Sequence, residues 1–176
     1  MDYHLYIGMG QGDIHPQHRE VMAALPGEWI VIDRYVEHPD TWRMDGAALG
    51  FKDQSLGAVY ASHVLEHFPM RETRRVLAEW YRVLRPEGRL IINVPDLDWA
   101  CLAWRHPALR TEYFRHDEKF LEIFYGGQDE PGEWHYTAFS ASRLRGLLYQ
   151  IGFYHVDTEQ RIDAHDMGVV IATAVK

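Results

Sequence analysis

The segment from Ser55 to Asp96 restricts the possible folds more than any other part of the chain. An apolar run ends at Ser62 and His63. It is followed by a stretch that places its apolar residues on one helical face, and then by a run rich in β-branched residues. This pattern predicts a strand, a polar turn, a helix and a second strand, over residues 58–61, 71–84 and 89–94, with a helix stop at 86–88. Open α/β sheets usually bind ligands at such a turn. We therefore expect the functional site there.

Length and composition narrow the class of protein. The chain has 176 residues, which suffice for one well-buried domain, so we predict a single domain over 1–176. A net charge of −8 without a basic stripe argues against nucleic-acid binding. The one cysteine, Cys101, excludes an internal disulfide network. No apolar stretch approaches the ~18 residues of a membrane span, and the first ten residues lack a signal-peptide pattern. We expect a cytoplasmic protein that does not bind membranes.

Strand and helix patterns alternate along most of the chain, which predicts a doubly wound, mainly parallel α/β sheet. Ser140 or Ser142 is suited to cap the last helix, and Gly152 to end it. Residues 97–136 form an aromatic-rich insertion over the active-site edge, which either shapes an acceptor pocket or lid or serves as a packing or homodimer surface. Further strands are expected at 4–7, 29–32, 41–44, 155–161 and 167–175, and helices at 16–25 and 140–151.

A glycine-rich loop follows the first expected strand and points to a bound ligand. Gly8, Gly10 and Gly12 allow a backbone to approach a ligand closely. Asp33 ends the next strand about 20 residues later, where a carboxylate can accept hydrogen bonds from ribose hydroxyls. A dinucleotide fingerprint needs a third glycine at the position of Asp13, where a carboxylate would repel a pyrophosphate but tolerate an ammonium group. The loop therefore suits S-adenosylmethionine better than NAD.

The turn after the third expected strand is a second candidate for cofactor contact. Asp45 could accept a hydrogen bond from an adenine amino group, beside Gly46 and Ala47. A solvated turn acid is the alternative interpretation of Asp45.

Several motifs resemble those of the class I S-adenosylmethionine-dependent methyltransferases. The closest resemblance is to small bacterial methyltransferases with the signature SHVLEHF … EWYRVLRPGGRL … VPDL, and it is carried by ASHVLEHF at 61–68, WYRVLRPEGRLIINVPDLD at 80–98 and the late HYTAF and LRGLLYQIGF runs. It implies a Rossmann-like seven-stranded sheet whose last strand is antiparallel. It also implies a cofactor site around Gly8, Gly10, Gly12, Asp33 and Asp45, and methyl transfer to a small-molecule or sugar-like acceptor.

Three features depart from the family pattern. Tyr6 stands where an acid often precedes the glycines, Gly57 replaces a usual Asp, and no helix precedes the first strand. These departures favour an alternative function, a non-catalytic S-adenosylmethionine-binding protein that acts through a partner.

The HVLEH run admits three interpretations. His63, Glu66 and His67 match the inverted zinc-protease pattern, but that pattern needs both histidines on one helical turn, and His63 directly follows a strand. Alternatively, the run resembles the E-x-x-E-H of some O-methyltransferases that hold a divalent cation there, with His63 in place of the first acid. That resemblance implies a cation at Glu66 and His67, with His135 as a further ligand, which could orient an acceptor hydroxyl and lower its pKa. In the third interpretation Ser62 and His63 contact the cofactor while the other two residues bond locally. We favour the third interpretation, in which no residue is a metal ligand. We therefore expect the methyltransferase activity to survive treatment with a chelator.

Catalysis places few demands on side chains. Methyl transfer is an in-line displacement, so alignment of the reactants supplies much of the rate. A general base is needed only where the nucleophile must lose a proton. The candidates near the carboxyl edge of the sheet are His63, His67, Asp96 and His135.

Overall fold

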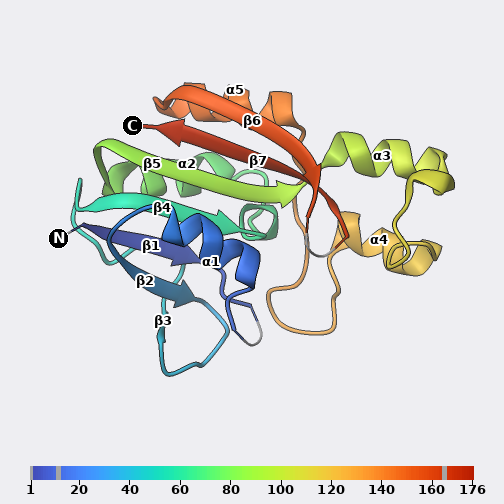
Figure 1. The fold of residues 1–176 in the computed structure, drawn as a ribbon, viewed down its shortest axis with the longest axis horizontal. Coiled ribbons are helices and arrows are strands. Elements are labelled where there is room, and N and C mark those ends of the chain that lie inside the picture. Colours follow the sequence, from blue (N-terminus) through green and yellow to red (C-terminus); the bar gives the residue numbers. More distant parts are fainter. Residues whose placement is uncertain (1, 11–12, 164–165) are drawn as a thin grey trace.

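The computed structural model describes residues 2–10, 13–163 and 166–176 and contains one seven-stranded sheet (Figure 1). Its strands are β1 (Tyr3–Ile7), β2 (Glu28–Asp33), β3 (Thr41–Arg43), β4 (Leu56–Ser62), β5 (Leu84–Pro95), β6 (Tyr154–Ile162) and β7 (Gly168–Val175). They lie in the order β3-β2-β1-β4-β5-β7-β6. β7 runs antiparallel to both of its neighbours, and the remaining pairs are parallel. The predicted doubly wound sheet with an antiparallel last strand is confirmed.

Helices cover both faces of the sheet. They are α1 (Pro16–Ala23), α2 (Thr73–Val83), α3 (Leu97–Arg105), α4 (Asp117–Tyr125) and α5 (Ala141–Ile151), with short 3-10 turns η1 (Leu65–His67) and η2 (Pro107–Leu109). α2 and α5 share the main core with one face, and α1 packs on the other. In Figure 1, α3 and α4 lie beyond the arrowheads of β1, β4 and β5. No helix among the described residues is long and apolar enough to span a membrane.

The central strands β1 and β4 are mostly apolar because both of their faces are covered. In β1, Leu5 belongs to the core under α2 and α5, whereas Tyr6 belongs to the cluster under α1. Val59 and Tyr60 alternate in the same way in β4. The side-chain period of two in a strand produces this division.

The end of α2 differs from the prediction. The helix ends at Val83, and β5 begins at once with Leu84, which pairs with Leu56 before a register shift. Residues 86–88 therefore belong to β5 and are not a free turn. Their backbone also bonds the carboxyl terminus, because Glu87 N donates to Lys176 O at 2.9 Å and Lys176 N donates to Gly88 O at 3.0 Å.

Local packing explains why residue 57 is a glycine. A Cβ at Gly57 would lie 2.8 Å from Cε1 of His4, so the missing side chain makes room for that buried ring. His4 Nε2 lies 3.1 Å from Pro26 O, which links β1 to the turn before β2. β4 keeps a regular parallel register with β1 from Ala58 to Ala61.

Candidate active site

A cleft of about 1300 Å³ opens at the carboxyl edge of the sheet. From β1 the chain turns to β2 on one side, and from β4 it turns to β5 on the other. Ligands of open α/β sheets bind at such a switch point, outside the carboxyl ends of the strands. The cleft is lined by the loops after β1, β2, β3 and β4 and by residues between 113 and 136. The expected site and the observed cleft therefore coincide.

Two glycines shape the loop after β1. Gly8 has φ +87°, and a Cβ there would lie 2.2 Å from Cγ2 of Val64, so only glycine lets this loop close on the loop after β4. Gly10 has φ +68°, and a Cβ there would meet no described atom within 4 Å. The space beside Gly10 is open to the cleft, which fits a ligand that approaches the backbone. The predicted Gly12 lies outside the described residues.

Asp33 ends β2 inside the cleft and ties two loops together. Its Oδ2 accepts a hydrogen bond from Gly10 N at 3.3 Å, and its Oδ1 accepts from Tyr35 N at 2.7 Å and Val36 N at 3.0 Å. Asp33 is only 9% exposed, so these bonds offset the cost of its burial. Asp33 is thus held beside the glycine loop at a fixed position.

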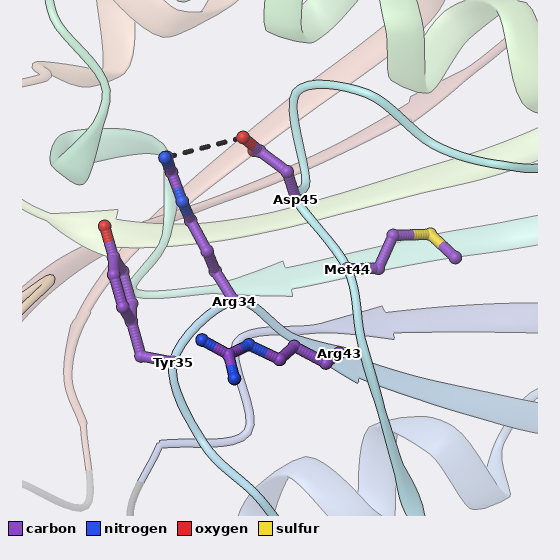
Figure 2. Close-up of a pocket in the computed structure, with 5 residues that line it drawn as sticks. All are labelled: Arg34, Tyr35, Arg43, Met44 and Asp45. Atoms are coloured by element: carbon purple, nitrogen blue, oxygen red, sulfur yellow. Dashed lines mark ion pairs between the residues drawn. The ribbon is translucent and has the colours of Figure 1, made fainter.

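Asp45 lies in a side cavity of about 290 Å³, lined by Arg34, Tyr35, Arg43, Met44 and Asp45 (Figure 2). Arg34 extends toward it, with Nη1 3.4 Å from Asp45 Oδ2. Asp45 Oδ1 accepts from Ala47 N at 2.9 Å. Gly46 lines the main cleft, whereas Ala47 lines neither cavity and its N–H is already bonded.

Ser62 belongs to a buried polar chain under the cleft. Its Oγ accepts a hydrogen bond from Asn93 Nδ2 at 3.3 Å and lies 3.4 Å from His18 Nε2. His18 Nδ1 in turn lies 2.7 Å from the Tyr60 hydroxyl. Burial raises the pKa of Tyr60 to about 12 and that of Tyr6 further, so both phenols are neutral. Tyr6 therefore brings no charge to the position where the family often has an acid.

His63 is held between two carboxylates. It has φ +52°, a left-handed conformation that is uncommon for a residue with a side chain. Its Nε2 lies 3.1 Å from Asp163 Oδ2, and its Nδ1 lies 3.4 Å from Glu66 Oε1. Burial alone would lower the pKa of His63, but these acids outweigh it and raise the pKa to about 9. His63 is therefore protonated at neutral pH, which does not suit a general base.

His135 lies beside Glu66 and His67 although it is distant from them in sequence. Glu66 O accepts from Tyr136 N at 2.8 Å and Thr137 N at 3.2 Å, which fixes this segment on η1. The His67 and His135 ring centroids are 4.8 Å apart. One ligand atom from each of Glu66, His67 and His135 lies within 4.8 Å of the other two. Burial lowers the pKa of His135. Burial would raise the pKa of Glu66, but the His63 contact and the nearby imidazoles lower it.

Asp96 has a structural position outside the cleft lining. It is 2% exposed and is the N-cap of α3, where its Oδ1 accepts from Asp98 N at 2.9 Å. Its Oδ2 accepts from Gln160 Nε2 at 2.6 Å. The structure thus separates Asp96 from the other three catalytic candidates, and its carboxylate stabilises α3 and β6.

Three residues at the carboxyl edge of the sheet were not predicted from the sequence. Arg34 and His18 line the cleft, and Asp163 contacts His63. Asp163 carried a usable signal, because it follows a strand that runs parallel to β5 and ends at the same edge. His18 lies in the first turn of the helix after the glycine loop, and nothing in its spacing distinguishes it from a surface histidine.

A family model described as a methyltransferase domain matches residues 5–92, half of the chain, from β1 into β5. The chain belongs to this methyltransferase domain family. The match includes the glycine loop, Asp33, Asp45 and the HVLEH run. No curated protein matches the chain.

Solved structures share the fold of this methyltransferase. An S-adenosylmethionine-dependent methyltransferase from Archaeoglobus fulgidus has a TM-score of 0.67 and 16% identity, over 99% of this chain and 86% of the other. The 1,6-didemethyltoxoflavin-N1-methyltransferase from Burkholderia thailandensis, with bound 1,6-didemethyltoxoflavin and S-adenosylhomocysteine, has a TM-score of 0.64 and 18% identity, over 99% and 70%. A methyltransferase from Methanosarcina mazei has a TM-score of 0.62 and 19% identity, over 99% and 92%. The TM-scores show a common fold.

Proposed function

We propose that this methyltransferase transfers the methyl group of S-adenosylmethionine to a small-molecule or sugar-like acceptor bound in the cleft. The observation that carries the proposal is the cleft itself, in which the glycine loop and Asp33 face the segment between 113 and 136. Its volume of about 1300 Å³ exceeds the ~300–1,000 Å³ of a typical small-ligand pocket, which leaves room for a cofactor and an acceptor together. The Burkholderia relative in fold, a small-molecule methyltransferase, supports the acceptor class.

The family match and the geometry support S-adenosylmethionine as the cofactor. Asp33 would accept hydrogen bonds from the ribose hydroxyls beside Gly10, and the side cavity at Asp45 would receive the adenine. Ser62 and His63 would lie at the methionine end, since Ser62 ends the neighbouring strand β4 and His63 follows it. The cofactor supplies a methyl group on a positively charged sulfur, which an acceptor can take without an activating base if its nucleophile carries no proton.

The other side of the cleft would bind the acceptor. Tyr113, Trp134 and Tyr136 are exposed aromatic residues that line it, and they can pack on an acceptor ring and exclude water. His67 and His135 line the same side. We propose that they are the polar groups nearest the acceptor, since Asp96 lies outside the cleft lining and His63 is protonated.

Cofactor binding should stabilise the protein measurably. At about 100 times its dissociation constant, a ligand adds about 2.7 kcal/mol to the free energy of unfolding. For a domain of this size, that gain corresponds to a rise in melting temperature of about 5–10 °C. We expect S-adenosylhomocysteine to cause this shift in a thermal melt and NAD to cause none. A shift with NAD alone would contradict the cofactor assignment.

The acceptor class can be tested with labelled cofactor and a fractionated cell extract. We expect label from the methyl group to enter the low-molecular-weight fraction in the presence of the wild-type protein. An Asp33→Ala variant, matched in concentration, should transfer far less. Label found mainly in precipitated protein or RNA would show that the acceptor is a macromolecule. The absence of any transfer would favour a protein that binds the cofactor without catalysis.

A further inference from the structure

The Glu66 side chain is the buried charge in this site with the poorest hydrogen bonding. It is 1% exposed; Oε1 has the ion pair with His63 as its only described polar partner, and Oε2 makes no hydrogen bond to a residue that the structure describes. His63 Nδ1 lies 3.4 Å from Oε1, a looser approach than a charge-assisted bond of about 2.7–2.9 Å. A buried carboxylate is costly unless it is paired and hydrogen-bonded or coordinates a metal.

The two neighbouring histidines are oriented as metal ligands usually are. His67 Nδ1 lies 3.1 Å from Trp134 O, and His135 Nδ1 lies 3.0 Å from Ile123 O. A carbonyl oxygen can only accept, so Nδ1 of each ring is the donor, and in the neutral ring this tautomer leaves the lone pair on Nε2. Metal-binding histidines commonly donate their other ring N–H to a backbone carbonyl in this way.

We propose that Glu66, His67 and His135 bind a divalent first-row transition-metal cation on the acceptor side of the cleft. This inference rests on the proposed function for its role and departs from the expectation that activity survives chelation. One ring nitrogen of each histidine and one carboxylate oxygen of Glu66 lie within 4.8 Å of one another. Ligands of one cation at ~2.0–2.2 Å lie roughly 3–3.5 Å apart, so the side chains draw together by roughly 1–2 Å on binding.

The donor set selects the kind of cation. Two imidazole nitrogens and one carboxylate suit Zn²⁺, Mn²⁺ or Fe²⁺ better than Mg²⁺ or Ca²⁺, which prefer oxygen ligands. Three protein ligands leave at least one coordination position, as in catalytic metal sites. His67 and His135 line the cleft, so that position faces the acceptor.

Such a cation points to a hydroxyl compound as the acceptor, and thus to O-methylation. A cation that contacts the hydroxyl oxygen lowers its pKa, and the proton leaves to water in the open cleft. The oxygen lone pair then forms the new C–O bond to the methyl carbon. The C–S bond breaks and its electron pair stays on sulfur, so the sulfonium becomes a neutral thioether.

Metal binding can be measured without cofactor or acceptor. The full chain is treated with EDTA, dialysed, and titrated with Mn²⁺, Zn²⁺ and Mg²⁺ by calorimetry, and with Co²⁺ by visible absorption. We expect one saturable site for the transition metals, at least tenfold weaker binding of Mg²⁺, and a Co²⁺ spectrum that reports nitrogen and oxygen ligands.

Two variants assign the site. Glu66→Gln keeps the size of the side chain and removes its charge, and His135→Gln removes one nitrogen ligand. Each should weaken Mn²⁺ binding at least tenfold. His106→Gln is the matched control, because His106 is exposed at the end of α3 and lies outside the cleft lining, and it should bind as the wild type does. Circular dichroism shows whether each variant is folded. If Glu66→Gln does not fold, the binding of Mn²⁺ by His135→Gln tests the site.

The outcomes separate this proposal from the proposed function. No saturable binding of any transition metal, or equal binding by the wild type and both folded variants, would overturn the metal site. A thermal shift with S-adenosylhomocysteine would still support the cofactor in that case. If the metal binds but S-adenosylhomocysteine causes no shift, the site stands and the proposed methyl transfer fails. EDTA should abolish methyl transfer to a hydroxyl acceptor, and added Mn²⁺ or Zn²⁺ should restore it.

Discussion

Replacing Trp80 with alanine should lower the free energy of unfolding by about 3–5 kcal/mol, one of the largest single-residue effects in this chain. Trp80 lies on α2 and is fully buried in the main core. Its Nε1 also donates a 2.8 Å hydrogen bond to Gly46 O. The substitution leaves a cavity and an unpaired carbonyl at the turn that lines the cleft. The melting temperature should fall by about 6–20 °C, and urea unfolding measures the loss directly.

Trp80→Phe separates the two contributions. It keeps most of the buried volume but removes the hydrogen bond to Gly46, which costs about 1–3 kcal/mol for an unsatisfied buried group. It should also weaken the binding of S-adenosylhomocysteine, because the turn from Asp45 to Ala47 loses its hydrogen bond to α2. A loss below 1 kcal/mol for Trp80→Ala would show that the core closes around the gap and that α2 is not fixed by this residue.

The central fold was predictable because its signals are local and agree with one another. The helical period of α2 and the apolar runs of β1 and β4 each appear within a short window. The N-cap of α5 was also predictable, since Ser140 Oγ accepts from Arg143 N and Gly152 follows the last turn with φ +119°. These features depend on neighbours in sequence.

Features that depend on distant contacts were not predictable. Residues 86–88 look like a turn but join β5, because Gly88 and Glu87 bond the carboxyl-terminal Lys176. α3 and α4 share a separate small core around Phe114 and Phe120, so the aromatic spacing of 97–136 shows no simple period. A tertiary partner determines the local structure in both segments.

The edge that holds the site was predictable, but the roles of its residues were not. Parallel strands end at one edge, so Asp33, His63 and Asp96 were all placed near it. Whether a carboxylate faces the cleft or caps a helix depends on the direction of the chain after the strand. Asp33 precedes a loop and lines the cleft, whereas Asp96 precedes α3 and caps it.

Replacing Asp33 with alanine should weaken the binding of S-adenosylhomocysteine about ten- to hundredfold. The predicted contact is a charged acceptor for two ribose hydroxyls, an interaction worth about 1.5–3 kcal/mol. The structure adds a second cause, because Asp33 also bonds the backbone of Gly10, Tyr35 and Val36. Loss of these bonds frees the glycine loop, so the variant has to order it again when the ligand binds. Titration calorimetry measures the affinity, and urea unfolding measures the stability of the free protein.

Asp33→Asn separates the contacts of Oδ2, which are Gly10 N and the proposed ribose, from the Oδ1 bonds to Tyr35 N and Val36 N. An amide oxygen can still accept from Tyr35 N and Val36 N, but the charge and the second acceptor oxygen are lost. The asparagine variant should therefore keep most of the stability of the free protein and still lose most of the affinity. Asp40→Asn is the matched control, since Asp40 is an exposed acid of the segment after β2 that lines neither cavity, and it should bind as the wild type does. If Asp33→Asn and Asp33→Ala both bind with wild-type affinity, β2 does not end at the ribose, and Asp33 serves only to hold its two loops.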